Sequence, residues 1–394
     1  MTTEAEPEVV EPRTSLVELA LLFSRLGATA FGGPAAHIAM MNVEVVKKRH
    51  WMTEQRFLDL LGAANLIPGP NSTELAIHIG WERRRWAGLL VAGVSFIVPA
   101  ALLAGGLGWA YVRYGALPAV GWILYGVKPA MVGVIVQALV GLAPKAAKTL
   151  PLRAVGLVAL VATALGVHEL GVLFGAGCLS ILAARPWREP PGSPPLVALA
   201  PGMLGVLTVP AGLTLPAIFV VFAKIGSVLF GSGYVLLAFL RSDLVQRLGW
   251  ITEGQLMDAV TVGQITPGPV FTTATFIGYV LRGPSGAAVA TLGIFLPAFV
   301  FVAMSGPLVQ RIRGSRWAGT FLDGVNVASL ALMAFVTFQL GRASLVDVPT
   351  ILIGLASAAV LLRWKPNPTW LVLGGGALGA LLQGLGLVGW AAPW

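Results

Sequence analysis

Two motifs rich in glycine and proline each occur twice in the sequence, with polar residues beside them. The two copies of the first motif contain Phe31, Gly32 and Gly33, and Phe230, Gly231, Ser232 and Gly233. The copies of the second motif contain Asn65, Pro68, Gly69, Pro70, Asn71, Ser72 and Thr73, and Gln264, Pro267, Gly268, Pro269, Thr272 and Thr273. Two prolines around a glycine should stop a helix, because each proline inside a helix costs ~3 kcal/mol or more.

A helix that restarts after such a break can bind an anion. Its first N–H groups lack partners within the helix, and they lie at the positive end of the helix dipole. Pro70 and Pro269 suit the first position of a helix, where no N–H is needed. The alternative is that glycine and proline only permit kinks and close helix packing. Four breaks in two matched pairs favour a binding site, and we assign the residues of both motifs to it.

Charged residues inside apolar segments are further candidates for the site. Arg25 and Lys224 occupy matching places before the first break, where a cation could face the anion. The alternative for both is that the side chain reaches toward lipid headgroups. Lys128 corresponds to Asn326 in the second copy, and Asp323 lies nearby. We treat these three residues as candidates for coupling, with a Lys128–Asp323 ion pair as the alternative.

Three more residues could carry protons. Glu74 follows Pro70 by one turn, and near an anion its carboxylate would be repulsive unless it were protonated. His37 and His78 could relay protons, since histidine titrates near neutral pH. The alternative for each is an ordinary polar residue satisfied by hydrogen bonds.

The composition predicts that these motifs lie in a membrane. Hydrophobic residues make up 56% of the 394 residues, charged residues only 11%, and the mean hydropathy is +0.83, so too little charge is present to cover a soluble surface. The apolar residues form runs long enough to span ~30 Å as helices. The net charge of +9 comes from short basic loops, which indicate membrane orientation rather than nucleic-acid binding. We therefore expect an all-α polytopic membrane protein in a lipid bilayer, with no nucleic-acid partner.

The chain consists of two homologous halves. An offset of 199 residues places Phe23 on Phe222, Trp51 on Trp250 and the first Pro-Gly-Pro on the second. We expect an acidic tail over 1–14, a first half over 15–184, a linker over 185–212 and a second half over 213–394. The motif from Trp51 to Asp59 resembles a helix start, so we assign it a structural role.

Loop charge predicts the topology. Basic residues at 47–49 and 83–85 flank residues 57–80, which would enter and leave the membrane on one side as a re-entrant hairpin broken at Pro-Gly-Pro. With 15–42 as a span, each half has about five transmembrane helices plus this hairpin. Five is odd, so the second half would be inverted. If 15–42 were itself re-entrant, the halves would be parallel.

Several classes of site are disfavoured by the sequence. Cys178 is the single cysteine, the four histidines show no metal-ligand spacing, and there is no phosphate-binding loop or dinucleotide motif. We therefore expect no cofactor, no metal and no enzymatic activity, with a membrane-embedded enzyme as the alternative. No cleavable signal peptide is evident.

The combination F-G-G-P, W-[MI]-T-E, D and P-G-P, present twice, resembles the chromate ion transporter family, in particular its two-domain members. The second half departs from the pattern at Phe230-Gly231-Ser232-Gly233, which lacks the proline, and at Gln264, where the first half has Asn65. The resemblance implies chromate efflux from the cytoplasm across a bacterial-type inner membrane, chromate resistance, coupling to protons and halves of opposite orientation. Sulfate or another anion is the alternative substrate, because sulfate has the same shape and charge. A homodimer is compatible with these expectations.

Overall fold

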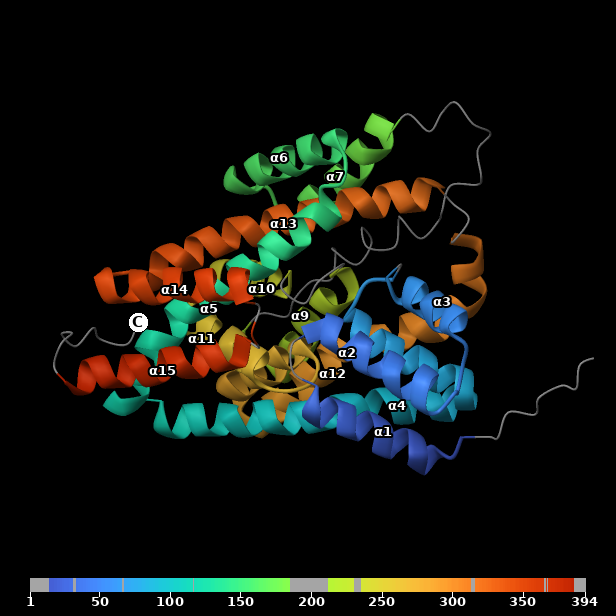
Figure 1. Ribbon diagram of the computed structural model, residues 1–394, viewed down its shortest axis with the longest axis horizontal. Coiled ribbons are helices and arrows are strands. Elements are labelled where there is room, and N and C mark those ends of the chain that lie inside the picture. Colours follow the sequence, from blue (N-terminus) through green and yellow to red (C-terminus); the bar gives the residue numbers. More distant parts are fainter. Residues whose placement is uncertain are drawn as a thin grey trace, which may run out of the picture.

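The structure, a computed structural model, is helical throughout its described part and contains no strand there (Figure 1). The described residues are 14–30, 33–65, 67–115, 117–184, 212–229, 235–312, 316–364, 366 and 368–385. The expected linker, apart from Gly212, lies outside them.

Helices of the two halves correspond one to one. The first half contains α1 (Leu16–Thr29), α2 (Gly33–Asn42), the π-helix η1 (Val43–Lys48), α3 (Glu54–Ala64), α4 (Asn71–Tyr114), α5 (Pro118–Ala146), α6 (Leu150–Ala164) and α7 (Glu169–Ala184). The second half contains α9 (Leu215–Val228), α10 (Leu236–Leu240), the π-helix η4 (Arg241–Arg247), α11 (Glu253–Ile265), the 3-10 turn η5 (Val270–Thr272), α12 (Thr273–Ile312), α13 (Arg316–Ser344), α14 (Val348–Trp364) and α15 (Pro368–Gly384).

The helix starts follow from local sequence. Thr53 caps α3 by accepting a hydrogen bond from the Arg56 N–H at 3.2 Å. Its counterpart Thr252 forms a reciprocal capping box with Gln255 at the start of α11. The motif that we assign a structural role therefore begins the same helix in each half.

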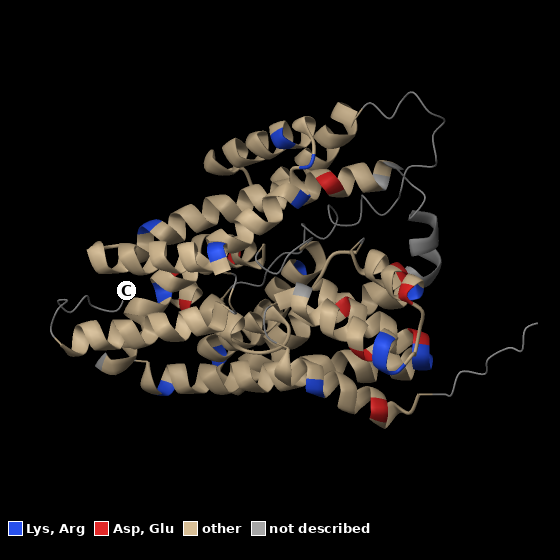
Figure 2. Cartoon of the chain, in the orientation of Figure 1, with Lys and Arg blue, Asp and Glu red and all other residues tan. Residues whose placement is uncertain are grey.

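Four segments of the described chain are long and apolar enough to cross a membrane: Asn71–Tyr114, Ala119–Ala146, Val270–Met304 and Gly319–Ser344. Shorter apolar helices accompany them, and the helices carry few charges along their lengths (Figure 2). The prediction of an all-α polytopic membrane protein is confirmed.

The longest helix of each half is broken at an equivalent place. In α4 the backbone leaves the helical region at Arg84 and Arg85, and Arg85 has φ 50°; in α12 the break is at Arg282 and Gly283, with φ 62° for the glycine. A positive φ is costly for arginine and not for glycine. The segment of α4 before this break pairs with α3, because Arg56 contacts Glu82 at 2.8 Å and Asn71 donates to Asn65 at 2.6 Å. Residues 54–83 thus form the re-entrant hairpin expected near 57–80.

The first segment differs from the single span expected over 15–42. The chain turns back after α1, so that α2 and η1 run antiparallel to it: His37 contacts the Ala30 carbonyl at 3.0 Å, and Glu44 contacts Arg25 at 2.7 Å. Lys224 and Asp243 make the equivalent contact between α9 and η4, so each half has two hairpins, the second of which turns at Pro-Gly-Pro.

Equivalent helices run antiparallel to each other. In α4, Gly93 faces Phe299 of α12 and Gly108 faces Tyr279, so the contacts advance along one helix and retreat along the other. This antiparallel pairing, rather than a count of spans, shows that the halves are inverted.

The halves also exchange helices. Helices α6 and α7 pack on α13 of the other half, while α14 and α15 pack on α5 (Figure 1). By contrast, α1 packs on α4 and α9 on α12, each within its own half.

We predict that Gly27→Ala destabilises the protein, because a Cβ at Gly27 would lie 2.3 Å from the Phe96 carbonyl oxygen. Overpacking of this kind costs roughly 1–3 kcal/mol. Thermal unfolding in detergent should show a lower midpoint than the parent. The control is Gly106→Ala, which meets nothing within 4 Å, and an equal midpoint in both variants would contradict the close packing of α1 on α4.

Candidate functional site

The tips of the four hairpins meet and are tied by two reciprocal hydrogen bonds. The Gly69 N–H donates to the Leu229 carbonyl at 2.7 Å, and the Gly268 N–H donates to the Ala30 carbonyl at 3.0 Å. Both glycines have positive φ, and a Cβ at Gly268 would lie 2.6 Å from the Gly27 carbonyl oxygen. Each Pro-Gly-Pro turn is therefore held by the first hairpin of the opposite half, and glycine is required for this approach.

Glu74 lies at this junction without a partner. Its side chain is fully buried, and neither carboxyl oxygen has a hydrogen-bond partner among the described residues. A Cβ added to Gly69 would lie 2.2 Å from one of these oxygens, so the carboxyl group packs against the Pro-Gly-Pro turn. Thr73 Oγ1 and His78 Nε2 are likewise buried and unpartnered within the described chain. Three hydrogen-bonding groups near the start of α4 are thus available to a ligand, water or proton.

His37 connects the two hairpins of the first half. Its Nε2 lies 3.0 Å from the Ala30 carbonyl and its Nδ1 lies 3.2 Å from Ser72 Oγ. Since a carbonyl only accepts, Nε2 carries the proton, and in the neutral ring Nδ1 accepts from the Ser72 hydroxyl. His37 thereby fixes the tip of α2 against the first turn of α4.

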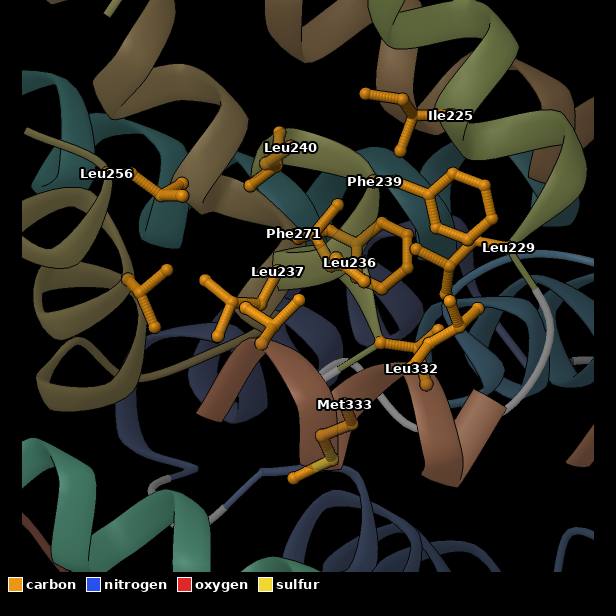
Figure 3. Packing of buried hydrophobic residues seen from close by; sticks show 14 of the residues in the cluster. Ile225, Leu229, Leu236, Leu237, Phe239, Leu240, Leu256, Phe271, Leu332 and Met333 are labelled. Atoms are coloured by element: carbon orange, nitrogen blue, oxygen red, sulfur yellow. The ribbon is translucent and has the colours of Figure 1, made fainter. Parts of the chain in front are cut away.

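The equivalent place in the second half is apolar. Leu236 stands where His37 does, Phe271 where Ser72 does and Ile277 where His78 does, and Leu236 and Phe271 belong to one buried cluster (Figure 3). Thr272 and Thr273 donate to the backbone carbonyls of Pro269 and Val270 at 2.8 and 2.7 Å. Their hydroxyl groups are therefore already used within their own turn.

The remaining residues of the breaks are placed as follows. Asn65 and Asn71 bridge the first Pro-Gly-Pro turn, and Gln264 is partly buried beside the second. Gly33 begins α2 with φ 75°. The following candidates lie outside the described residues: Phe31, Gly32, Phe230, Gly231, Ser232 and Gly233.

The structure places Arg25 and Lys224, both candidates for the anion site, in ion pairs. Arg25 is half exposed and contacts Glu44 at 2.7 Å, while Lys224 is buried and contacts both oxygens of Asp243 at 3.0 and 3.1 Å. Asp243 also accepts from Arg247 at 2.9 Å. Each π-helix thus holds the cation of the preceding helix through a carboxylate.

Glu44 lies at the end of its hairpin, outside the spans, and three cations surround it. Burial raises the pKa of Glu44, but hydrogen bonds from Lys48 and Arg49 and the charge of Arg25 outweigh it and lower the pKa to about 2. Glu44 is therefore ionised at physiological pH and fixes η1 to α1.

Lys128 pairs with a residue that the sequence did not suggest. Its ammonium group lies 3.3 Å from Asp258 of α11, and Tyr111 of α4 donates to the other oxygen of Asp258 at 2.8 Å. Asp323, the partner considered above, instead contacts the exposed Lys148 at 3.3 Å, and Asn326 is exposed.

Sequence reasoning missed Glu44, Asp243, Asp258 and Tyr111 as partners of the charged candidates. Glu44 and Asp243 are related by the same offset of 199 residues as Arg25 and Lys224. The repetition of both a basic and an acidic residue at this offset could therefore have identified Glu44 and Asp243 as partners. Nothing local connects Asp258 or Tyr111 with Lys128.

We predict that Lys224→Met destabilises the protein by about 3 kcal/mol, because Asp243 would keep only Arg247, which is 41% exposed on its side chain. The apolar double variant Lys224→Met/Asp243→Leu should recover most of the loss, and the exposed Arg25→Met serves as the milder control. Thermal unfolding in detergent measures all three. An unchanged midpoint for Lys224→Met together with lost anion binding would instead make Lys224 a ligand.

Comparison with known proteins agrees with the repeated architecture. The chromate transporter family matches residues 17–181 and 198–380. The chain is 34% identical to a chromate transport protein of Cupriavidus metallidurans, over 96% of this chain and 95% of that protein. It is 33% identical to a probable chromate transport protein of Synechococcus elongatus (92% and 95%) and 31% identical to a chromate transport protein of Pseudomonas aeruginosa (98% and 95%). No solved structure matches the chain. The chain therefore belongs to the chromate transporter family, a family of multi-pass membrane transporters.

Proposed function

We propose that this chain exports chromate from the cytoplasm across a bacterial-type inner membrane, driven by the proton motive force, and thereby confers chromate resistance. The observation that carries the proposal is the fully buried Glu74 at the junction of the hairpin tips, which has no hydrogen-bond partner in the described part of the chain. The names of the similar proteins support chromate as the substrate.

The anion would bind at the start of α4. Chromate is a tetrahedral dianion at neutral pH and has only acceptor oxygens, so hydrogen-bond donors and positive helix ends stabilise it. Within the described chain the hydroxyl of Thr73 is buried without a partner, while Ser72 in the same first turn would have to release His37 before its hydroxyl could donate to the anion. These groups and the helix N-terminus supply a binding surface of the required sign.

Glu74 would couple this site to protons. An ionised carboxylate buried without a partner is costly, and a dianion nearby would raise that cost. Glu74 is therefore protonated when chromate is bound. The proton on Glu74 leaves with the dianion against the pH gradient, and the pair carries one net negative charge outward. Only the electrical part of the proton motive force, roughly 2.3 kcal/mol per charge per 100 mV, therefore drives export.

We predict that everted vesicles take up labelled chromate when a potassium diffusion potential makes their lumen positive, and that an acidic lumen slows the uptake. Chromate should be recovered unreduced from the lumen, which separates transport from an enzymatic reduction. Absence of uptake under any gradient would contradict export. Faster uptake with an acidic lumen would instead indicate proton exchange. Complete inhibition by equimolar sulfate would favour a sulfate transporter that accepts chromate incidentally.

We also predict that Glu74→Gln transports chromate with little pH dependence, because the amide imitates the protonated carboxyl group. The parent should lose activity as the pH rises and Glu74 ionises. Initial rates of vesicle uptake over a pH series test this. Glu18→Gln, which removes an exposed carboxylate near the start of α1, is the matched control and should retain the parental profile. An unchanged profile in Glu74→Gln would exclude Glu74 as the coupling group.

A further inference from the structure

The second hairpins of the two halves are equivalent in sequence but differ in burial. Leu58 on α3 is 49% exposed, whereas its counterpart Met257 on α11 is 1% exposed. Asp59 is partly buried and Asp258 fully buried. The exposed Leu58 lies one turn after the exposed Glu54 and Gln55, on a polar part of the helix. One hairpin is therefore open at its outer surface, and the other is packed.

Three side chains hold the packed hairpin. Asp258 of α11 contacts Lys128 of α5 and accepts from Tyr111 of α4, so it connects three helices. The residues equivalent to Lys128 and Tyr111 in the other half are Asn326 and Val309, neither of which carries a charge. The arrangement of Lys128, Asp258 and Tyr111, which we call the latch, therefore has no counterpart built from the same chemistry on α3.

The first hairpin of the second half is packed as well. The side chains of α10 are all buried, and they pack with Leu332 and Met333 of α13 (Figure 3). In the equivalent helix α2, Ile38 and Met40 are only partly buried and Ala39 is exposed. Both hairpins of the second half are thus closed, and both hairpins of the first half are more open.

We propose that the latch is the gate on one face of the membrane. During transport the hairpins that contain α3 and α11 would alternate, one packed while the other is open. In the present state α11 is latched, whereas Leu58 of α3 is exposed. In the opposite state α3 would pack and α11 would separate from Lys128. The basic loops place the α3 face in the cytoplasm, so the exposed Leu58 lies on the cytoplasmic side and the latch closes the external path, while Glu74 itself is buried.

The surroundings of the latch allow this movement. A cavity of about 420 Å³ lies beside Asp258, lined by Tyr111 and otherwise mainly by apolar side chains of α5, α11 and α15. The cavity gives α11 room to move on this side, although Leu256 and Met257 would leave the buried core. The latch itself must break, and separating a buried ion pair is costly unless each charge finds another partner. Opening of the gate is therefore rare until the charges are compensated.

Cysteine reporters at equivalent positions test the gate. In a Cys178→Ser background, Leu58→Cys and Met257→Cys are labelled by a membrane-impermeant maleimide in everted and right-side-out vesicles without chromate. We expect Leu58→Cys to be labelled from the cytoplasmic face and Met257→Cys to be protected from both faces. Adding Lys128→Met should raise labelling of Met257→Cys from the external face by about tenfold or more and lower that of Leu58→Cys.

The matched control is Lys148→Met, which removes the exposed partner of Asp323 and should change neither rate. Asp258→Asn is the second test of the latch, and a monodisperse elution profile in detergent verifies that each variant folds. Unchanged labelling in both latch variants would overturn the proposal, as would ready labelling of Met257→Cys in the parent. External labelling of Leu58→Cys would overturn the assigned direction. The gate proposal rests on the proposed function only for the identity of the transported ion. The labelling experiment contains no chromate, so it tests the gate even if chromate uptake fails.

Discussion

Two backbone hydrogen bonds, Gly69 to Leu229 and Gly268 to Ala30, are the constraint on which the rest of the structure depends. Non-helical backbone at membrane depth must find partners inside the protein. Here each broken hairpin supplies the partner of a hairpin from the opposite half. Both halves are therefore needed to satisfy the broken segments. Within one half alone, the glycine N–H of the Pro-Gly-Pro turn would lack the carbonyl group that accepts its hydrogen bond.

The two halves share this backbone plan and differ in the side chains placed on it. His37, Ser72 and Glu74 are polar where Leu236, Phe271 and Thr273 are apolar or satisfied by their own turn. The polar junction is where we propose that the anion and the proton bind, while the apolar one packs tightly (Figure 3). Sequence divergence has thus given a symmetric scaffold one polar and one apolar side.

Much of this architecture could be predicted from the sequence, because the periodic signals are local. The offset of 199 residues predicted equivalent helices, and Pro68-Gly69-Pro70 predicted the hairpin between α3 and α4. The turn after α1 was only the alternative to a single span, since an apolar segment with a Gly-Gly-Pro break is compatible with either a kink or a reversal. The role that we propose for Glu74 could be suspected from its place after Pro70. The partner of Lys128 depends on tertiary packing between residues 130 positions apart, which no spacing in the sequence reveals.

The exchange of helices between the halves has a consequence for synthesis. When the first half emerges from the ribosome, α6 and α7 have no α13 to pack on, and α5 lacks α14 and α15. The Gly69 amide and the Lys128 ammonium are also without the groups that will satisfy them. The nascent first half must therefore wait in the bilayer as an incomplete, partly hydrated assembly. Folding is completed only when the oppositely oriented second half inserts between its helices.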